Sequence, residues 1–365
     1  MRISVSQAGN SVEVSGFGDP IRFDVTGLDL PPLQDHTFAA WLMLPWAMKT
    51  GEAIEIDGPV DPLAIENIRR FSNAWELWEP SKFNPVTVVA ASRAEPTTGE
   101  DRLTFYSGGL DSTDMLLQLG RQPHPGTALT VHGFDYPSSA GDQFAELRDQ
   151  VAPFLEALNY RHVTLSISRV AGGRHSYALR LAAAGFLFSG MFSEGILAAD
   201  ANWEQDMALF PWGLNHVTDR YLKGKNFRIS TVGDQKTRPI KAKALLQDKM
   251  ALQAVSFCKR RSIRPKNCGT CSKCVRTKIM FSVFGDIPQI FVDNSFDASL
   301  TNSIDIHDRN ERVLLIDLYQ IARDEGLAVD LHVQRLFERP KGAEATTGRR
   351  WDRLKNRLFG PRTAG

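Results

Sequence analysis

The chain has few cysteines and no long apolar stretch. Only 4 of its 365 residues are cysteine, and all four lie within residues 258–274. No apolar run reaches the roughly 20 residues that a membrane-spanning helix needs, and the first residues lack the basic-then-apolar pattern of a secretion signal. These absences argue against a membrane protein and against a disulfide-stabilised secreted scaffold. We therefore expect a cytoplasmic protein with no membrane partner.

Neither positive nor negative charge is in excess. The net charge is +1 and the hydrophobic content is 42%, which excludes a disordered polyelectrolyte and is typical of a packed globular chain. The length predicts one large or two smaller domains.

A glycine-rich turn at residues 107–112, Ser-Gly-Gly-Leu-Asp-Ser, lacks the marks of the two commonest nucleotide loops. No Gly-Lys-Ser/Thr follows it, and the GxGxxG pattern is absent. A short apolar-alternating run, Leu103–Phe105, precedes the turn, and apolar residues at helical spacing follow it up to Gly120. Strand, turn and helix in this order point backbone N–H groups at a phosphate. The plainer alternative is a serine–glycine turn between core elements.

Each residue type in this turn suits a phosphate. Gly108 and Gly109 let the backbone approach closely, the hydroxyl groups of Ser107 and Ser112 can donate, and Asp111 can hold a Mg²⁺ ion on the phosphates. The turn is similar to the SGGxDS signature of the PP-loop ATP pyrophosphatases, which implies ATP and Mg²⁺ as cofactors. The candidate nucleotide-binding residues of the turn are therefore Ser107, Gly108, Gly109, Leu110, Asp111 and Ser112.

Strand and helix patterns alternate from residue 102 to about 257, which predicts an α/β fold with a doubly wound, mostly parallel sheet. Before it, residues 1–95 read as a small α+β domain of unknown role, with a polar linker at 92–101. After it we expect a four-cysteine segment at 258–285, C-terminal helices at 286–340 and a basic tail at 341–365. In the tail, seven Lys and Arg residues outweigh two acids, which leaves open a nucleic-acid contact or simply a solvated terminus.

Ligands of such sheets bind beyond the carboxyl ends of the strands. The loops expected there carry Asp135, Arg174 and Arg238, with Lys241 shortly after. An acid for a ribose or amine and several cations for phosphate or carboxylate suit a nucleotide site. We take Asp135 and Arg238 as further nucleotide-binding candidates, and Asp111, Arg174 and Lys241 as the candidate catalytic residues.

The cysteines follow the spacing C-x9-C-x2-C-x2-C, at Cys258, Cys268, Cys271 and Cys274. Two consecutive CxxC steps and a fourth thiolate from a short loop predict a closed tetrahedral Zn²⁺ site with a structural role. An iron–sulfur cluster is the alternative.

With both motifs in hand, residues 102–280 resemble 7-cyano-7-deazaguanine synthase, a member of the PP-loop ATP pyrophosphatase superfamily. Local matches are Asp135-Tyr136, Gly173-Arg174 and Lys241-Ala242. The resemblance implies ATP-dependent adenylation of a 7-carboxy-7-deazaguanine carboxylate, followed by conversion with ammonia to the amide and then the nitrile.

The chain departs from that pattern in the Pro137-Ser138-Ser139 segment, in the Trp203–His216 segment and in its long flanks. The acceptor is therefore left open between ammonia and an amine of a protein or nucleic acid, as in a bacterial defence system. A protein partner and a homodimer also stay open. Sulfur transfer is disfavoured because all four cysteines are assigned to a metal, and a non-catalytic nucleotide- and nucleic-acid-binding module is the alternative outside enzymes.

Overall fold

The computed structural model describes residues 1–95, 99, 101–209, 211–305, 307–327, 329 and 334–335. It consists of two compact units. The first unit contains residues 1–236 and 248–257, and the second contains residues 237–247 and those from 258 onward. The predicted tail at 341–365 and most of the last part of the predicted helical region, from residue 328 to 340, lie outside the described residues.

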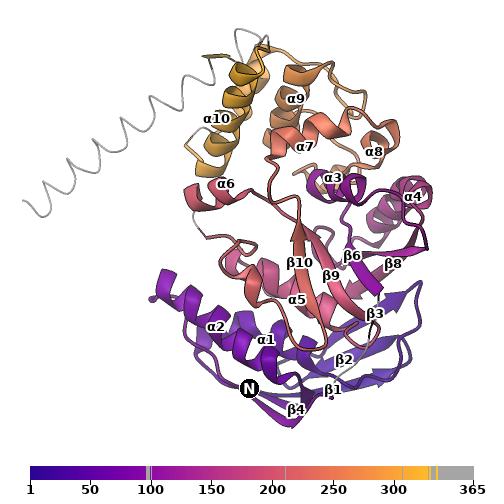
Figure 1. Cartoon of the computed structure of the whole chain (residues 1–365), viewed down its shortest axis with the longest axis vertical. Helices are drawn as coiled ribbons and strands as arrows, with labels where there is room; N and C mark the ends of the chain where they lie inside the picture. The colour runs from indigo at the N-terminus through magenta and orange to yellow at the C-terminus, as the bar shows by residue number, and fades with distance from the viewer. Residues whose placement is uncertain are drawn as a thin grey trace, which may run out of the picture. The chain divides into compact units, whose positions relative to one another are not determined.

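The first unit is built on a ten-stranded sheet with the order β10-β9-β6-β7-β8-β3-β2-β1-β4-β5. Half of it is a parallel block formed by β6 (Asp101–Phe105), β7 (Gly126–His132), β8 (Tyr160–Ile167), β9 (Phe192–Ala198) and β10 (Arg228–Val232). The other half is mixed, and the prediction of an α/β fold with a mostly parallel sheet is confirmed. Figure 1 shows β10, β9 and β6 side by side.

Residues 1–95, expected to form a small α+β domain, supply the other half of this sheet. They contain β1 (Arg2–Ala8), β2 (Ser11–Ser15), β3 (Ile21–Thr26), β4 (Ile54–Val60) and β5 (Val88–Arg93). In β3 the apolar residues Ile21, Phe23 and Val25 are buried and the polar ones between them are exposed, as a half-buried strand requires. β3 pairs antiparallel with β8, with Phe23 opposite Ile167, and so joins the two halves.

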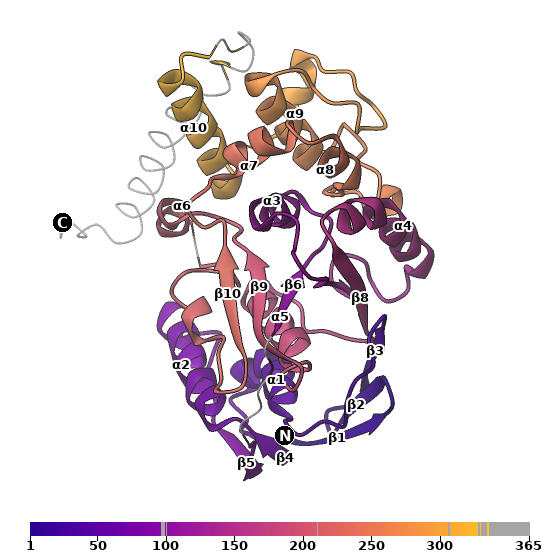
Figure 2. The same ribbon diagram turned by 45° about the vertical axis from the view of Figure 1, so that its right-hand side comes forward.

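Two helices of this N-terminal region lie side by side, α1 (Thr37–Thr50) and α2 (Pro62–Trp78) (Figure 2). α2 begins where Asp61 caps it, accepting hydrogen bonds from the N–H groups of Leu63 and Ala64, with Pro62 at the first helical position. Trp41 on α1 and Trp75 on α2 are fully buried. These tryptophans are core residues.

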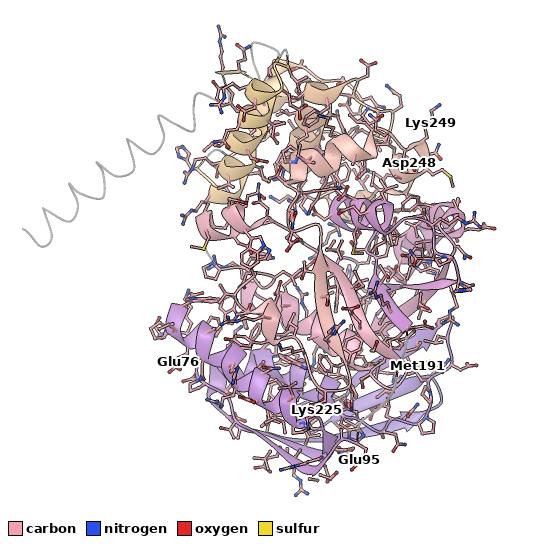
Figure 3. All side chains as sticks on the ribbon, in the orientation of Figure 1. Glu76, Glu95, Met191, Lys225, Asp248 and Lys249 are labelled. Carbon is pink, nitrogen blue, oxygen red and sulfur yellow. The ribbon has the colours of Figure 1, made fainter. Side chains whose placement is uncertain are left out.

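Helices connect the parallel strands in the alternation predicted from the sequence. They are α3 (Leu110–Leu119), α4 (Gly141–Ala157), α5 (Tyr177–Phe186) and the short α6 (Trp203–Ala208), while α8 (Lys249–Ala254) follows the last strand. Asp248 caps α8 by accepting from the Ala251 N–H at 2.9 Å, and Figure 3 labels Asp248 and Lys249 where this helix begins. α8 packs against α3 and α4.

The second unit is helical around the cysteine segment. α7 (Arg238–Leu245) packs against α9 (Ser272–Phe284) and α10 (Arg309–Asp324). Arg276 on α9 pairs with Glu311 on α10 at 2.6 Å, and both side chains are largely buried. Across the described parts of both units, no helix combines the length and apolar character needed to cross a membrane.

Candidate functional site

The Ser107–Ser112 turn lies at the point of the parallel block where the strand order reverses. The chain runs from β6 outward through β7 to β8, and then returns to place β9 on the other side of β6. The turn follows β6 directly and opens α3. In open α/β sheets this crevice, beyond the carboxyl ends of the strands, is where ligands bind.

The turn is held by its own serines. The hydroxyl oxygens of Ser107 and Ser112 are 3.2 Å apart, and the Gly109 N–H donates to the Ser107 hydroxyl at 3.2 Å. The Ser112 hydroxyl in turn donates to the Gly109 carbonyl at 3.1 Å. Within the described residues, no side chain caps the first turn of α3. A ten-residue helix thus presents its N-terminal dipole at the turn, as an anion site requires.

Gly108 shows why glycine stands in this turn. Its φ of +72° lies in the left-handed region that L side chains rarely adopt. A Cβ at this position would stand 3.0 Å from Leu147 on α4. The Gly108 carbonyl accepts from the Ser256 N–H at 2.7 Å, which ties the turn to the chain after α8.

Acidic residues from neighbouring loops face the same phenol. Asp111 opens α3, Asp135 follows β7 and Asp200 follows β9. Burial raises the pKa of Tyr177 well above its ordinary range, and the charges of Asp200, Asp135 and Asp111 raise it further. Two of the residues predicted from the sequence, Asp111 and Asp135, therefore both act on the phenol of Tyr177.

Arg180 is the cation at this place. Its guanidinium carbon lies 5.4 Å from the ring centre of Tyr177 and 5.3 Å from that of Phe134. Burial lowers the pKa of Arg180, while Tyr177 and Asp135 oppose that shift. Neither Tyr177 nor Arg180 was among the residues predicted from the sequence, because both lie on α5 rather than in a strand-end loop. The only signal for them is helical spacing, three residues apart.

A second unpredicted contact joins α3 to the loop after β10. Lys236 Nζ is 3.2 Å from a carboxylate oxygen of Asp114, whose side chain is 1% exposed. The Gln118 side chain also donates to Asp114 at 2.5 Å. This pair fixes the β10 loop against the helix that carries Asp111.

The remaining predicted residues are on other elements. Arg174 begins a short 3-10 helix, η1 (Arg174–Ser176), and its guanidinium is 4.0 Å from the Glu79 carboxylate. Arg238 and Lys241 lie on α7 in the second unit, where the Lys241 side chain is buried. Asp135 and Asp111 of the Ser107–Ser112 turn both act on Tyr177, and the catalytic roles of Arg174 and Lys241 stay predictions.

The four cysteines of the second unit converge. Cys258, Cys268, Cys271 and Cys274 are buried, unbridged, and have their sulfur atoms within 4.8 Å of one another, so that they could hold a metal ion. The Cys258–Cys271 and Cys268–Cys274 sulfur distances are 3.9 and 3.8 Å. A tetrahedron with Zn–S bonds of about 2.3 Å has edges of about 3.8 Å. The predicted convergence of the four cysteines is confirmed, and the dimensions of the cluster fit zinc.

The surroundings of Cys268 favour its thiolate. The N–H groups of Thr270 and Cys271 donate to the Cys268 sulfur at 3.4 and 3.3 Å. Burial raises the pKa of Cys268, but these donors outweigh it and the net shift is downward. Lys278, 0% exposed, donates to the carbonyls of Asp293 and Ser295 at 2.6 and 2.7 Å. The backbone around Asp293 also contacts the cysteine cluster, since the Asp293 N–H donates to the Cys268 carbonyl at 3.3 Å.

Comparison of the chain with protein-family models, with curated proteins and with solved structures returns no match in any of the three.

Proposed function

We propose that the protein is an ATP-dependent ligase that adenylates the carboxylate of a deazapurine, with 7-carboxy-7-deazaguanine as the expected substrate. The reaction releases pyrophosphate and leaves an acyl-adenylate, which an amine then converts to an amide or, after a second activation, a nitrile. The observation that carries the proposal is the Ser107–Ser112 turn at the switch point of the sheet, followed by the uncapped start of α3.

In this proposal the turn binds the phosphates as charge builds on the leaving pyrophosphate. The backbone N–H groups at the start of α3 are already oriented, so they stabilise that charge without reorganising. Ser107 and Ser112 hold one another at 3.2 Å and would exchange this contact for a phosphate oxygen. Mg²⁺, when bound, neutralises phosphate charge as a Lewis acid, and Asp111 in the first turn of α3 is its expected ligand.

The adjacent side chains suit the other end of the substrate. Asp135 is an exposed carboxylate that can accept from a ribose hydroxyl or a base amine. Arg180, held over the rings of Phe134 and Tyr177, is a planar cation suited to a carboxylate. The tetrahedral zinc site has no open position in this proposal, and its role is to stabilise the second unit.

The test is product analysis. Purified protein with ATP, Mg²⁺ and 7-carboxy-7-deazaguanine should release AMP and pyrophosphate, and Asp111→Asn should lower the rate by roughly 100-fold or more. Asp142→Asn is the matched control, because Asp142 is also an acid in the first turn of a helix, α4, and is exposed. Release of ADP in place of AMP, or equal rates for the two variants, would contradict the proposal.

A further inference from the structure

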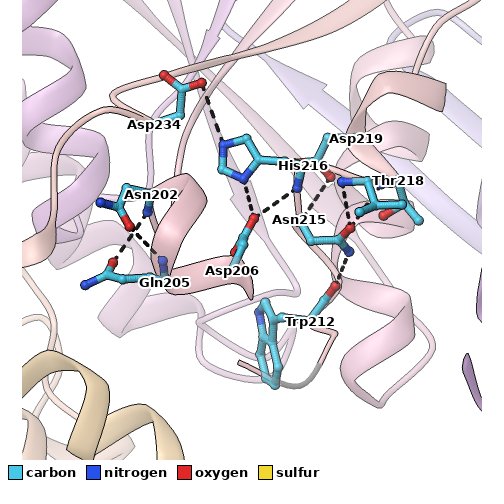
Figure 4. Close-up of polar contacts among 10 residues, drawn as sticks. Asn202, Gln205, Asp206, Trp212, Asn215, His216, Thr218, Asp219 and Asp234 are labelled. Atoms are coloured by element: carbon cyan, nitrogen blue, oxygen red, sulfur yellow. Dashed lines mark hydrogen bonds and ion pairs between the residues drawn. The ribbon is translucent and has the colours of Figure 1, made fainter. Parts of the chain in front are cut away.

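A histidine and an aspartate in the segment that follows β9 form a polar cluster with an aspartate that follows β10. The segment begins with α6, which Asn202 caps by accepting from the Gln205 N–H at 2.9 Å. Farther along, the Asn215 side chain accepts from the Thr218 N–H at 3.0 Å and donates to the Trp212 carbonyl at 2.6 Å. These bonds hold the described residues of the segment in one conformation beyond the six residues of α6 (Figure 4).

His216 lies between the two carboxylates (Figure 4). Its Nδ1 is hydrogen-bonded to the Asp206 carboxylate, which also accepts from the His216 backbone N–H at 3.0 Å. Its Nε2 is 3.7 Å from a carboxylate oxygen of Asp234. Within the described residues, this buried Nε2 has no hydrogen-bond partner.

The contact with Asp206 decides which nitrogen carries the proton. A carboxylate can only accept, so in neutral imidazole Nδ1 bears the hydrogen and Nε2 presents its lone pair. That lone pair then faces the oxygen of Asp234, and two acceptors 3.7 Å apart repel each other. A group with two N–H donors would satisfy both, and an ammonium group or a primary amine is the simplest such group.

Trp203 packs its ring against the His216 ring. Its ring centre is 4.0 Å from that of His216, and the residue is 56% exposed. Aromatic faces attract ammonium groups through the ring quadrupole. Carboxylates and an aromatic face together select a cation rather than a phosphate.

The cluster belongs to the same edge of the sheet as the Ser107–Ser112 turn. Asp234 follows β10 at its carboxyl end, and two residues later Lys236 pairs with Asp114 on α3. The segment itself leaves the sheet at the carboxyl end of β9, the strand beside β6.

We propose that His216 is the general base that accepts a proton from the acceptor amine, and that Asp206 and Asp234 orient the base and the amine. This inference rests on the proposed adenylation. The ammonium form gives one proton to His216 Nε2, and the free amine attacks the acyl carbon of the acyl-adenylate. A C–N bond forms, the bond from that carbon to the phosphate oxygen breaks with its electrons on AMP, and the nitrogen loses its second proton to water.

The test separates acyl transfer from adenylation in His216→Ala. With 7-carboxy-7-deazaguanine, ATP–pyrophosphate exchange reports adenylation, and mass spectrometry reports product from ammonium or from hydroxylamine. Hydroxylamine is unprotonated at neutral pH, so it needs no base for the first proton. We expect His216→Ala to lower amide formation from ammonium by roughly 100-fold, while exchange and hydroxamate formation from hydroxylamine stay near wild type. His124→Ala, an exposed histidine, is the control and should match wild type throughout.

Three results would overturn the inference. If His216→Ala uses ammonium as fast as wild type, His216 is not the base, and the proposed adenylation stands. If the variant loses exchange and both acceptors to the same extent, His216 only holds the segment in place. If the wild-type protein shows no exchange with this substrate, the proposed function fails first, and the inference fails with it.

Discussion

The N–H of Ser256 donates to the carbonyl of Gly108 at 2.7 Å, so the chain after α8 is bonded to the proposed phosphate turn. Beside it, the Tyr136 hydroxyl lies 3.0 Å from the Ser256 hydroxyl. Ser256 therefore links the turn after β6 to the loop after β7. The turn is held from outside as well as by its own serines, which makes it sensitive to small changes at Gly108.

Gly108→Ala should destabilise the first unit and weaken ATP binding. The left-handed conformation costs an L residue about 1–2 kcal/mol, and the added Cβ would stand 3.0 Å from Leu147. Gly9→Ala is the control, because Gly9 has a φ of +60° with open space around it. Urea unfolding and ATP titration should show the larger loss at Gly108, and ATP affinity should change only there. Equal losses in both variants would mean that the turn has no special role.

Lys236→Met should destabilise the protein by about 3 kcal/mol or more, because it leaves the Asp114 carboxylate buried without its cation. Adding Asp114→Asn to that variant should recover part of the loss, since the uncompensated charge is then removed. Denaturant midpoints of the single and double variants measure this. If the double variant is as unstable as the sum of the single ones, the two residues do not act as a pair.

Cys271→Ser should release the metal and destabilise the second unit. We expect one zinc ion per chain by elemental analysis, with loss of zinc after the substitution or on treatment with a strong chelator. Ser272→Ala, at the neighbouring position, should keep its zinc. Iron and acid-labile sulfide in place of zinc would support the iron–sulfur alternative.

His175 should make stability depend on pH. It packs between Trp75 and Phe83, and burial lowers its pKa from 6.5 to about 4. Between those values the unfolded chain binds a proton that the folded chain does not, so the free energy of unfolding falls as the pH drops from 6.5 towards 4. The contribution of His175 is fully present above pH 6.5, and its loss amounts to at most about 3 kcal/mol.

His175→Gln tests this dependence, because glutamine does not titrate. Unfolding at pH 7.5 and at pH 5 should show a smaller difference in the variant than in the wild type, whatever the cost of the substitution itself. An unchanged difference would assign the pH dependence to other groups, of which His162 has a pKa lowered in the same way by burial.

Local sequence patterns predict much of the fold. The alternation of Ile21, Phe23 and Val25 predicts a half-buried strand, and the turn–helix pattern after Phe105 places Ser107–Ser112 at the end of β6. The spacing of the cysteines predicts their convergence, because two CxxC steps leave little freedom of arrangement.

The remaining features depend on contacts between residues far apart in the chain. The pairing of β3 with β8 joins residues more than a hundred positions apart, and no periodicity encodes it. No periodicity encodes the contact of Lys236 with Asp114 either, or the contact of Asp234 with His216. Propensity and spacing are local quantities, so they cannot name the partner of a charged side chain.

The most direct test of the proposed adenylation is ATP–pyrophosphate exchange with 7-carboxy-7-deazaguanine and Mg²⁺, in which the wild type is compared with Asp111→Asn and Asp142→Asn. The proposed adenylation requires exchange that depends on the carboxylate substrate, is lost in Asp111→Asn and is retained in Asp142→Asn. Absence of exchange in the wild type, or exchange that persists in Asp111→Asn, would contradict it.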